Sequence, residues 1–177
     1  MENQMIEVEL TIEMRQIAWS KARDMGRLKN SIMGGEGNEV GFLGELVCQK
    51  ILGGVLTNTY EYDIILPDGR SADCKSKKCT SIPYPHYECS IANFNTSQKC
   101  DFLAFARIEF LNGKYTRGWF LGVIKKEEYF ERARKLIKGT TDGSNGFKVR
   151  ADCYNLRIDE LYDSIEEIDK KKNNKDL

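Results

Sequence analysis

The tripeptide Pro67-Asp68-Gly69 constrains this chain most, because it separates two segments, residues 60–66 and 71–79, that fit a pair of antiparallel strands. In a three-residue turn centred on Asp68, glycine takes the left-handed position that such turns favour. Asp63 would then lie directly opposite Asp73, since both are equally far from Asp68 along the chain. Their Cβ atoms would be about 5 Å apart on one face of the sheet. A four-residue loop would instead put them on opposite faces.

Two carboxylates that face each other repel unless a cation lies between them. Because side chains alternate along a strand, Lys75 points to the same face as Asp73, and Lys77 follows it. Carboxylate oxygens favour Mg²⁺ or Mn²⁺ over zinc, and a metal held by two or three protein groups keeps water molecules that it can activate. The pattern therefore predicts a hydrolytic metal site.

A helix is predicted just before this hairpin, over residues 38–52, with Asn38 as its N-cap and Gly53-Gly54 at its end. Its apolar face has helical spacing and consists of Val40, Leu43, Val47 and Ile51. Glu45 projects from a different side. Gly41 and Gly44 cost a helix about 2 kcal/mol relative to alanines, so we expect them to allow close approach to a neighbouring backbone.

Three short motifs resemble those of the PD-(D/E)XK nuclease superfamily in order and spacing: Gly44-Glu45-Leu46-Val47, Tyr62-Asp63-Ile64 and Asp73-Cys74-Lys75. The resemblance covers residues 38–124, and its specificity comes from the conjunction of the motifs. Tyr62 stands where the family name has proline, and Asp73 where glutamate is frequent; neither change removes a ligand. The resemblance implies an α/β fold with a restriction-endonuclease-like core, in which helices flank a mixed central β-sheet.

The resemblance also implies roles for these residues. Asp63 and Asp73 would bind Mg²⁺, for which Mn²⁺ can substitute, with help from the Cys74 main-chain carbonyl, and Glu45 would contribute directly or through water. Lys75 would act on the attacking water, as a positioning group or base, or would stabilise the pentavalent phosphate; the sequence leaves both roles open. The expected activity is hydrolysis of DNA phosphodiester bonds by an endonuclease of restriction, repair or phage type, leaving 5′-phosphate and 3′-hydroxyl ends.

Further contacts to nucleic acid are expected from Lys77, Lys78 and Gln98. Lysine plus arginine equals aspartate plus glutamate at 27 each, so the net charge gives no reason to expect a polyanionic partner, and any binding surface must be local. An ordinary surface lysine is the alternative for Lys77. Helix capping and solvation are the alternative for Gln98, which follows a predicted helix start at Thr96-Ser97.

The rest of the chain predicts one domain over residues 1–169: an extension (1–37), the catalytic core (38–124) and a helix-strand-helix segment (125–169), followed by a disordered tail (170–177). In the extension, an edge strand at 5–10 precedes a helix capped by Thr11 that runs to about Lys29, and residues 31–37 form a glycine-rich loop. The buried side of that helix is expected to hold Ile12, Ile17, Ala18, Ala22 and Met25.

Later elements are predicted from the same patterns. A hairpin of residues 102–110 and 115–124 turns at Asn112-Gly113, with Trp119 and Phe120 in the core. The remaining expected elements are a strand at 87–92, a helix at 96–100, a helix at 126–138 with Phe130, Ala133 and Ile137 inward, a strand at 147–154 and a helix at 159–168.

Composition limits the alternatives. The single histidine, His86, disfavours HNH nucleases and histidine-ligated zinc hydrolases. A zinc-binding interaction domain built on Cys74, Cys79, Cys89 and Cys100 would lack recognisable ligand spacing. A catalytically silent nucleic-acid-binding module of the same fold stays open. With 41% apolar and 31% charged residues and no apolar run of membrane-spanning length, we expect a cytoplasmic protein, in the host cytoplasm if phage-encoded, and no membrane partner. A homodimer would gather more basic surface.

Overall fold

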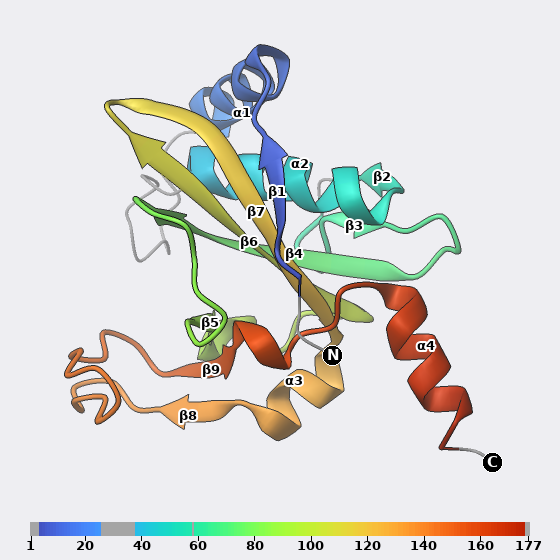
Figure 1. Ribbon diagram of the computed structural model, residues 1–177, viewed down its shortest axis with the longest axis vertical. Coiled ribbons are helices and arrows are strands. Elements are labelled where there is room, and N and C mark those ends of the chain that lie inside the picture. Colours follow the sequence, from blue (N-terminus) through green and yellow to red (C-terminus); the bar gives the residue numbers. More distant parts are fainter. Residues whose placement is uncertain (1–3, 26–37, 58, 176–177) are drawn as a thin grey trace.

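The computed structural model describes residues 4–25, 38–57 and 59–175, apart from the side chain of Phe94. Its strands form a larger sheet in the order β1-β7-β6-β4-β3-β2 and a smaller sheet in the order β5-β9-β8 (Figure 1). The elements are, in chain order, β1 (Ile6–Glu9), α1 (Ile12–Met25), α2 (Asn38–Leu52), β2 (Val55–Leu56), β3 (Ile64–Ile65), β4 (Ser71–Cys79), β5 (Glu88–Ala92), the 3₁₀-helix η1 (Asn93–Asn95), β6 (Phe102–Leu111), β7 (Lys114–Lys125), α3 (Lys126–Arg132), β8 (Arg134–Leu136), β9 (Cys153–Arg157), the 3₁₀-helix η2 (Ile158–Glu160) and α4 (Ile165–Asn173).

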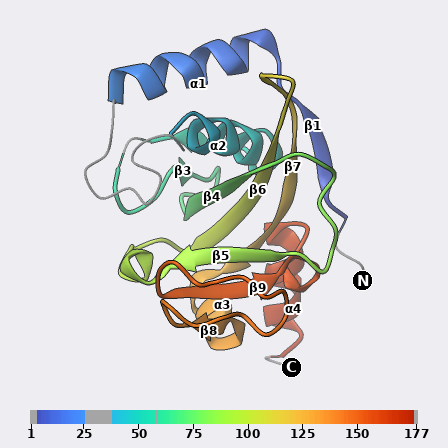
Figure 2. The same cartoon turned by 90° about the vertical axis from the view of Figure 1, so that its left-hand side faces the viewer.

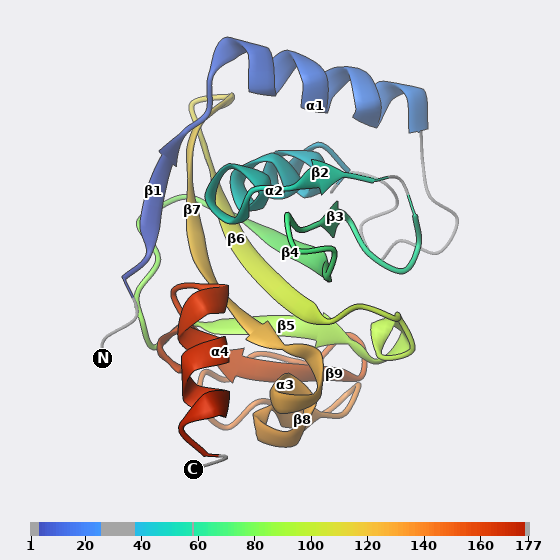
Figure 3. The same cartoon turned by 90° about the vertical axis from the view of Figure 1, so that its right-hand side faces the viewer.

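The larger sheet is mixed. β4 and β6 run parallel, whereas the other neighbouring strands in this sheet are antiparallel. α2 packs on β4 and β6, and α1 packs on the outer side of α2 (Figures 2 and 3). The smaller sheet and α3 lie on the opposite side of the β6–β7 hairpin. The expected α/β architecture, a mixed sheet flanked by helices, is therefore confirmed.

None of the helices within the described residues combines the length and the apolar character that crossing a membrane requires.

The turn at Pro67-Asp68-Gly69 has the predicted length. Ile64 pairs with Ala72 and Ile65 with Ser71, which is the register that a three-residue turn imposes, and Gly69 has a φ of 89°. β3 is shorter than predicted, because residues 59–62 directly before it are irregular and are held by side-chain hydrogen bonds. The hydroxyls of Thr57 and Thr59 both donate to the main-chain oxygen of Tyr62, at 3.0 and 2.8 Å.

The second hairpin is also confirmed. Asn112 and Gly113 have φ values of 51° and 76°, as the two central residues of a tight turn between twisted strands require. Trp119 and Phe120 are buried in the core as predicted.

α2 has the predicted bounds, with Val40, Leu43 and Val47 buried and Ile51 partly buried. The expected close approach occurs at Gly44, where a Cβ atom would lie 2.4 Å from Cβ of Ser76 on β4. At Gly41 the expectation is wrong, since a Cβ there would meet nothing within 4 Å. Gly44 therefore lets α2 lie directly on β4.

The N-terminal segment matches in outline and differs in burial. β1 is an edge strand of the larger sheet, and the Thr11 hydroxyl accepts a hydrogen bond from the Met14 N–H at 3.2 Å, as an N-cap does. Ile12, Ile17 and Met25 are exposed, contrary to the prediction, because α1 packs on α2 along a narrow stripe that includes Ala18. The end of the predicted helix near Lys29 and the 31–37 loop lie outside the described residues.

Between β4 and β6 the prediction is half right. A strand forms at Glu88–Ala92, but it belongs to the smaller sheet, where it pairs with β9. Residues 96–100 are not helical. The short η1 turn precedes them, and they run irregularly into β6 because their polar groups bond to Tyr60 and Glu61.

The C-terminal third departs most from expectation. The helix predicted over 126–138 ends at Arg132, and the chain then enters β8, whose partner β9 replaces the strand predicted at 147–154. Arg134 at the start of β8 is tied to Glu88 at 2.8 Å and Asp142 at 3.1 Å, contacts that a continued helix would break. The predicted inward residue Ile137 is exposed, whereas Tyr129 is fully buried.

The last helix begins later than predicted. Ser164 caps α4, with its hydroxyl accepting from the Glu167 N–H at 3.2 Å, and the helix continues through Asn173. Residues 170–173 are thus helical and not part of a disordered tail.

Tyr129 on α3 ties the smaller sheet to the larger one. Its ring stacks on Phe105 of β6, and its hydroxyl lies 3.1 Å from the main-chain oxygen of Cys89 and 2.6 Å from that of Tyr154. β5 is thereby held against the larger sheet.

Candidate catalytic site

The four residues predicted to carry the chemistry come together in the structure. Glu45 lies on α2, Asp63 directly before β3, and Asp73 and Lys75 on β4. Asp63 and Asp73 shift each other's pKa through the interaction of their charges and through a hydrogen bond. Glu45 and Asp63 shift each other's pKa in the same two ways. The Lys75 ammonium lies 2.6 Å from Oδ2 of Asp73.

Side chains of β4 alternate as predicted. Cys74 and Ser76 face α2: the Cys74 thiol lies beside Cys48, and the Ser76 hydroxyl donates to the Val40 main-chain oxygen at 3.1 Å. Lys75 faces the other way and donates to Gln98 Oε1 at 3.2 Å. The main-chain N–H of Cys74 donates to Oδ2 of Asp63 at 2.7 Å, which fixes this aspartate at the end of the hairpin.

All three acids titrate well above their usual range. Burial raises the pKa of Glu45 to about 7, and the neighbouring Asp73 adds to this effect, while Lys21 and Lys75 oppose it. Burial, with the charge of Glu45, raises the pKa of Asp63 to about 6. Burial likewise raises the pKa of Asp73 to about 7, with Lys75 opposing and Asp63 reinforcing the shift. Near neutral pH these acids are therefore only partly ionised, because burial and mutual repulsion disfavour their charged forms. A bound cation would stabilise the charged forms.

Gln98 belongs to this site. It is 6% exposed, and its Nε2 donates to the Tyr60 main-chain oxygen at 2.5 Å and lies 3.4 Å from Oδ1 of Asp73. The alternative of helix capping and solvation is wrong, since Gln98 is buried and the chain around it is not helical. Its hydrogen bonds depend on the folded 59–62 segment, so the sequence around Gln98 does not reveal them.

The structure also adds a residue that the sequence did not single out. Lys21 on α1 lies close enough to lower the pKa of Glu45, which brings a second ammonium to the cluster. No pattern within α1 distinguishes this lysine from the other charged residues of the helix.

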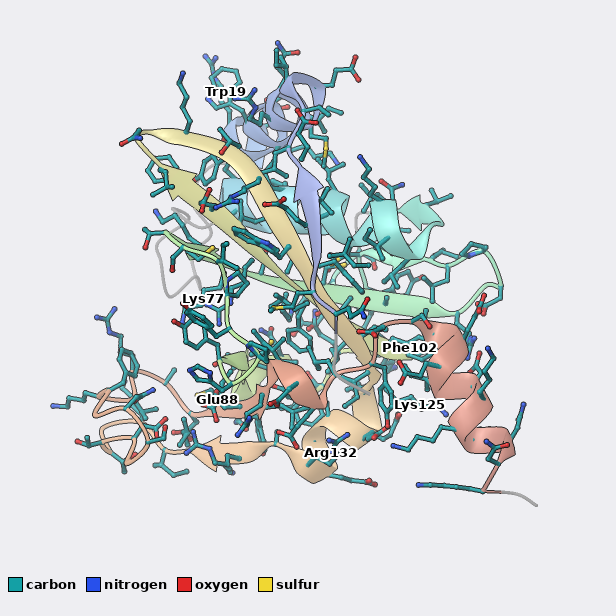
Figure 4. The ribbon with its side chains drawn as sticks, viewed as in Figure 1. Trp19, Lys77, Glu88, Phe102, Lys125 and Arg132 are labelled. Carbon is teal, nitrogen blue, oxygen red and sulfur yellow. The ribbon has the colours of Figure 1, made fainter. Side chains whose placement is uncertain are left out.

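Lys77 and Lys78 lie on opposite faces of β4. Lys77 is an exposed residue on the side of the molecule where β5 lies (Figure 4), and partial burial of its ammonium, together with the charge of Arg107, lowers its pKa. Lys78 lies over the ring of Phe110, 5.0 Å from its centroid. The structure thus places Lys77 on the face of Asp73 and Lys75, and does not place Lys78 there.

The donor set suits a hard cation. Oδ2 of Asp73 is buried and accepts no hydrogen bond from the described residues, although the Lys75 ammonium lies next to it. Asp63 and Asp73, the Cys74 carbonyl and Glu45 supply oxygen donors of the type that Mg²⁺ prefers. As these side chains stand, the described part of the chain contains no group of three histidine, cysteine or acidic side chains arranged as a metal centre. The set is a candidate site whose side chains would have to rearrange to share a cation.

The four cysteines of the zinc alternative are not gathered in one place. Cys74 lies beside Cys48, Cys89 lies near Arg107 and Lys77, and Cys100 lies against the Asp73 main chain. All six cysteines are free thiols, and burial raises the pKa of Cys100 to about 12.

Comparison with known proteins adds no relative. No protein-family model matches the sequence, and no curated protein does. The case for a function therefore depends on the arrangement of Glu45, Asp63, Asp73 and Lys75.

Proposed function

We propose that this protein is a Mg²⁺-dependent deoxyribonuclease with a restriction-endonuclease-like core, which cuts within DNA to leave 5′-phosphate and 3′-hydroxyl ends. The observation that carries the proposal is the convergence of three buried acids, each with a raised pKa, around the Lys75 ammonium. Strongly perturbed acids beside a lysine on adjoining elements are more typical of a reaction centre than of a stabilising ion pair.

The residues would share the work as follows. Asp63 and Asp73, with the Cys74 carbonyl, would hold Mg²⁺, and Glu45 would bind it directly or through a water molecule. Bound there, the ion supplies activation of water and positive charge for the phosphate oxygens. Lys75 would orient or deprotonate the attacking water, or neutralise charge on the pentavalent phosphate. Gln98 would hold the Lys75 ammonium in place through its amide oxygen.

The succession of elements supports this fold. α2 precedes the β3–β4 hairpin that carries the acids, and β6 then runs parallel to β4. The resemblance implies one more strand and a helix between β4 and β6, whereas the chain has β5 of the smaller sheet and the short η1. In place of that helix, Gln98 would position Lys75, because its amide group contacts both the Tyr60 main-chain oxygen and the Lys75 ammonium.

One observation favours a catalytically silent nucleic-acid-binding module instead. The ammonium of Lys75 lies directly against Asp73 and already compensates its charge, as a purely structural ion pair would. A metal ion would have to compete with this contact. The two functions differ in whether divalent ions support turnover.

Cleavage assays distinguish them. The protein is incubated with supercoiled, linear, branched and single-stranded DNA and with RNA, in Mg²⁺, Mn²⁺ or EDTA. Asp73→Asn and Lys75→Ala are the test variants, and Asp68→Asn and Lys78→Ala are matched controls from the same hairpin that lie away from the acids. Metal-dependent cutting that both test variants lose and both controls keep supports the nuclease. Cutting that survives in both test variants contradicts the site, and binding without cutting by the wild type favours the silent module.

A further inference from the structure

Two cations lie side by side on the face of the larger sheet that carries Asp73 and Lys75. β4 and β6 are parallel neighbours, and their register places Lys77 opposite Arg107. The positive charges of both residues act to lower the pKa of the Cys89 thiol on β5, so both charged groups lie near that residue. Lys77 is exposed, whereas Arg107 is only 8% exposed.

The acids on this face already have partners. Asp73 pairs with Lys75 at 2.6 Å, and Glu109 pairs with Arg117 at 2.8 Å. Arg117 also reaches Glu7. Their charges are therefore not available to Lys77 and Arg107.

Within the described part of the chain, no carboxylate lies within salt-bridge distance of Lys77 or Arg107. The Arg107 guanidinium donates to the neutral main-chain oxygen of Glu88, at 2.9 Å. Cys89 cannot supply a negative charge either, since burial raises the pKa of its thiol to about 12. Burying an arginine without a counter-charge is unfavourable, and an anion bound beside it would repay that cost.

We infer that Lys77 and Arg107 form a subsite for one phosphate of a nucleic-acid backbone, next to the phosphate that is cut. This inference rests on the proposed function for the position of the cut, and on the charges alone for the phosphate. Lys77 is two residues beyond Lys75, a separation of about 6.6 Å along a strand, which is of the order of the spacing between successive phosphates. The backbone would thus run along β4, from Lys75 toward Cys79.

The two side chains suit different parts of this task. The guanidinium of Arg107 is held by the Glu88 main chain, so its remaining N–H groups are fixed in direction and can donate to phosphate oxygens. Lys77 is an exposed residue, but partial burial of its ammonium and the charge of Arg107 lower its pKa, so a phosphate bound between the two cations would stabilise the charged form. Contacts of this kind position the nucleic acid and carry no sequence information.

The test measures binding of a short fluorescent DNA duplex by anisotropy, in EDTA, over a range of salt concentrations. Lys77→Gln is the main variant, and Lys78→Gln is its matched control, since it makes the same change on the opposite face of the strand. Arg107→Lys, which keeps the charge, and Arg107→Gln form a second pair, with circular dichroism to check folding. Lys77→Gln remains informative if Arg107→Gln does not fold.

The expected result is an approximately tenfold loss of affinity for Lys77→Gln, with the slope of log K against log salt reduced in size by about 0.9 for the lost phosphate contact. Lys78→Gln should bind as the wild type does. Equal affinities and slopes for Lys77→Gln and Lys78→Gln would overturn the subsite, as would failure of the wild type to bind.

Cleavage in Mg²⁺ separates the two proposals. If the wild type cuts while Lys77→Gln binds and cuts normally, the subsite is wrong and the nuclease stands. If the wild type does not cut but Lys77→Gln still lowers affinity and slope, the phosphate subsite is supported and the nuclease proposal fails.

Discussion

The Lys75 ammonium lies 2.6 Å from Oδ2 of Asp73, two residues earlier on the same strand. This contact joins the cation of the site to its most buried acid, since Asp73 is 2% exposed. Because side chains alternate along β4, Asp73 and Lys75 share the face that points away from α2 and are close enough to pair. Gln98 then limits where the ammonium can move, by accepting its hydrogen bond at 3.2 Å.

Lys75→Met is expected to slow DNA cleavage by roughly 10²–10³-fold, as loss of one charge-stabilising donor does in other enzymes. Binding of Mg²⁺ should persist, because all the oxygen donors remain. Single-turnover cleavage and calorimetric titration with Mg²⁺ measure the two effects separately. Lys78→Met is the control, and equal cleavage rates for the two variants would contradict a catalytic role for Lys75.

The free energy of unfolding should fall as the pH rises from about 4 to about 7. Glu45 has a pKa of about 7 in the folded protein against an ordinary value of 4.5, so the folded state binds more protons than the unfolded state between these values. Asp63 and Asp73 act in the same direction. Urea unfolding at a series of pH values, without divalent ions, measures the effect. Stability that rises steadily over this interval would show that the acids are not held as the structure implies.

Glu45→Gln is expected to stabilise the metal-free protein by about 1–3 kcal/mol at pH 7, because it removes a charge that burial disfavours. At pH 4.5 the gain should nearly vanish, since wild-type Glu45 is then protonated in the folded state. The same variant should lose cleavage activity. Glu39→Gln, on the first turn of α2, is the control. Burial also raises the pKa of Glu39, but no acid of the cluster contributes to that shift.

Mg²⁺ should raise the Tm more at pH 8 than at pH 5.5. The metal binds the ionised acids and competes with protons at groups whose pKa values are about 6 to 7. Thermal unfolding with and without Mg²⁺ at the two pH values gives the comparison. Asp73→Asn should abolish the difference, and an equal Tm increase in this variant would place the ion elsewhere.

Much of this site could be predicted because its parts are set by local rules. The Pro67-Asp68-Gly69 turn fixes the register of the hairpin, and alternation then fixes the face of Lys75. Helical periodicity gives the bounds of α2 and separates Glu45 from the buried face.

Contacts that depend on distant partners were not predicted. Gln98 was expected only as a nucleic-acid contact, whereas its amide is held by the main-chain oxygen of Tyr60, and Lys21 is brought to the cluster by the packing of α1 on α2. The 126–138 segment has helical periodicity throughout, yet its second half joins the smaller sheet, where Arg134 meets Glu88 and Asp142. Such long-range pairings outweigh local propensity and leave no periodic signal.

Gly44 and Gly41 provide the sharpest test of how α2 is seated. Gly41→Ala should stabilise the protein by about 0.5–1 kcal/mol, because the added methyl group meets nothing within 4 Å and alanine favours the helix. Gly44→Ala should instead destabilise it by about 1–3 kcal/mol, since the methyl group would lie 2.4 Å from Cβ of Ser76 and α2 would have to move off β4. That movement would carry Glu45 away from Asp63, so cleavage should fall with stability in Gly44→Ala and stay unchanged in Gly41→Ala. Urea unfolding and cleavage rates of the two variants are the measurements, and stabilisation by both substitutions would show that α2 does not lie on β4 as described.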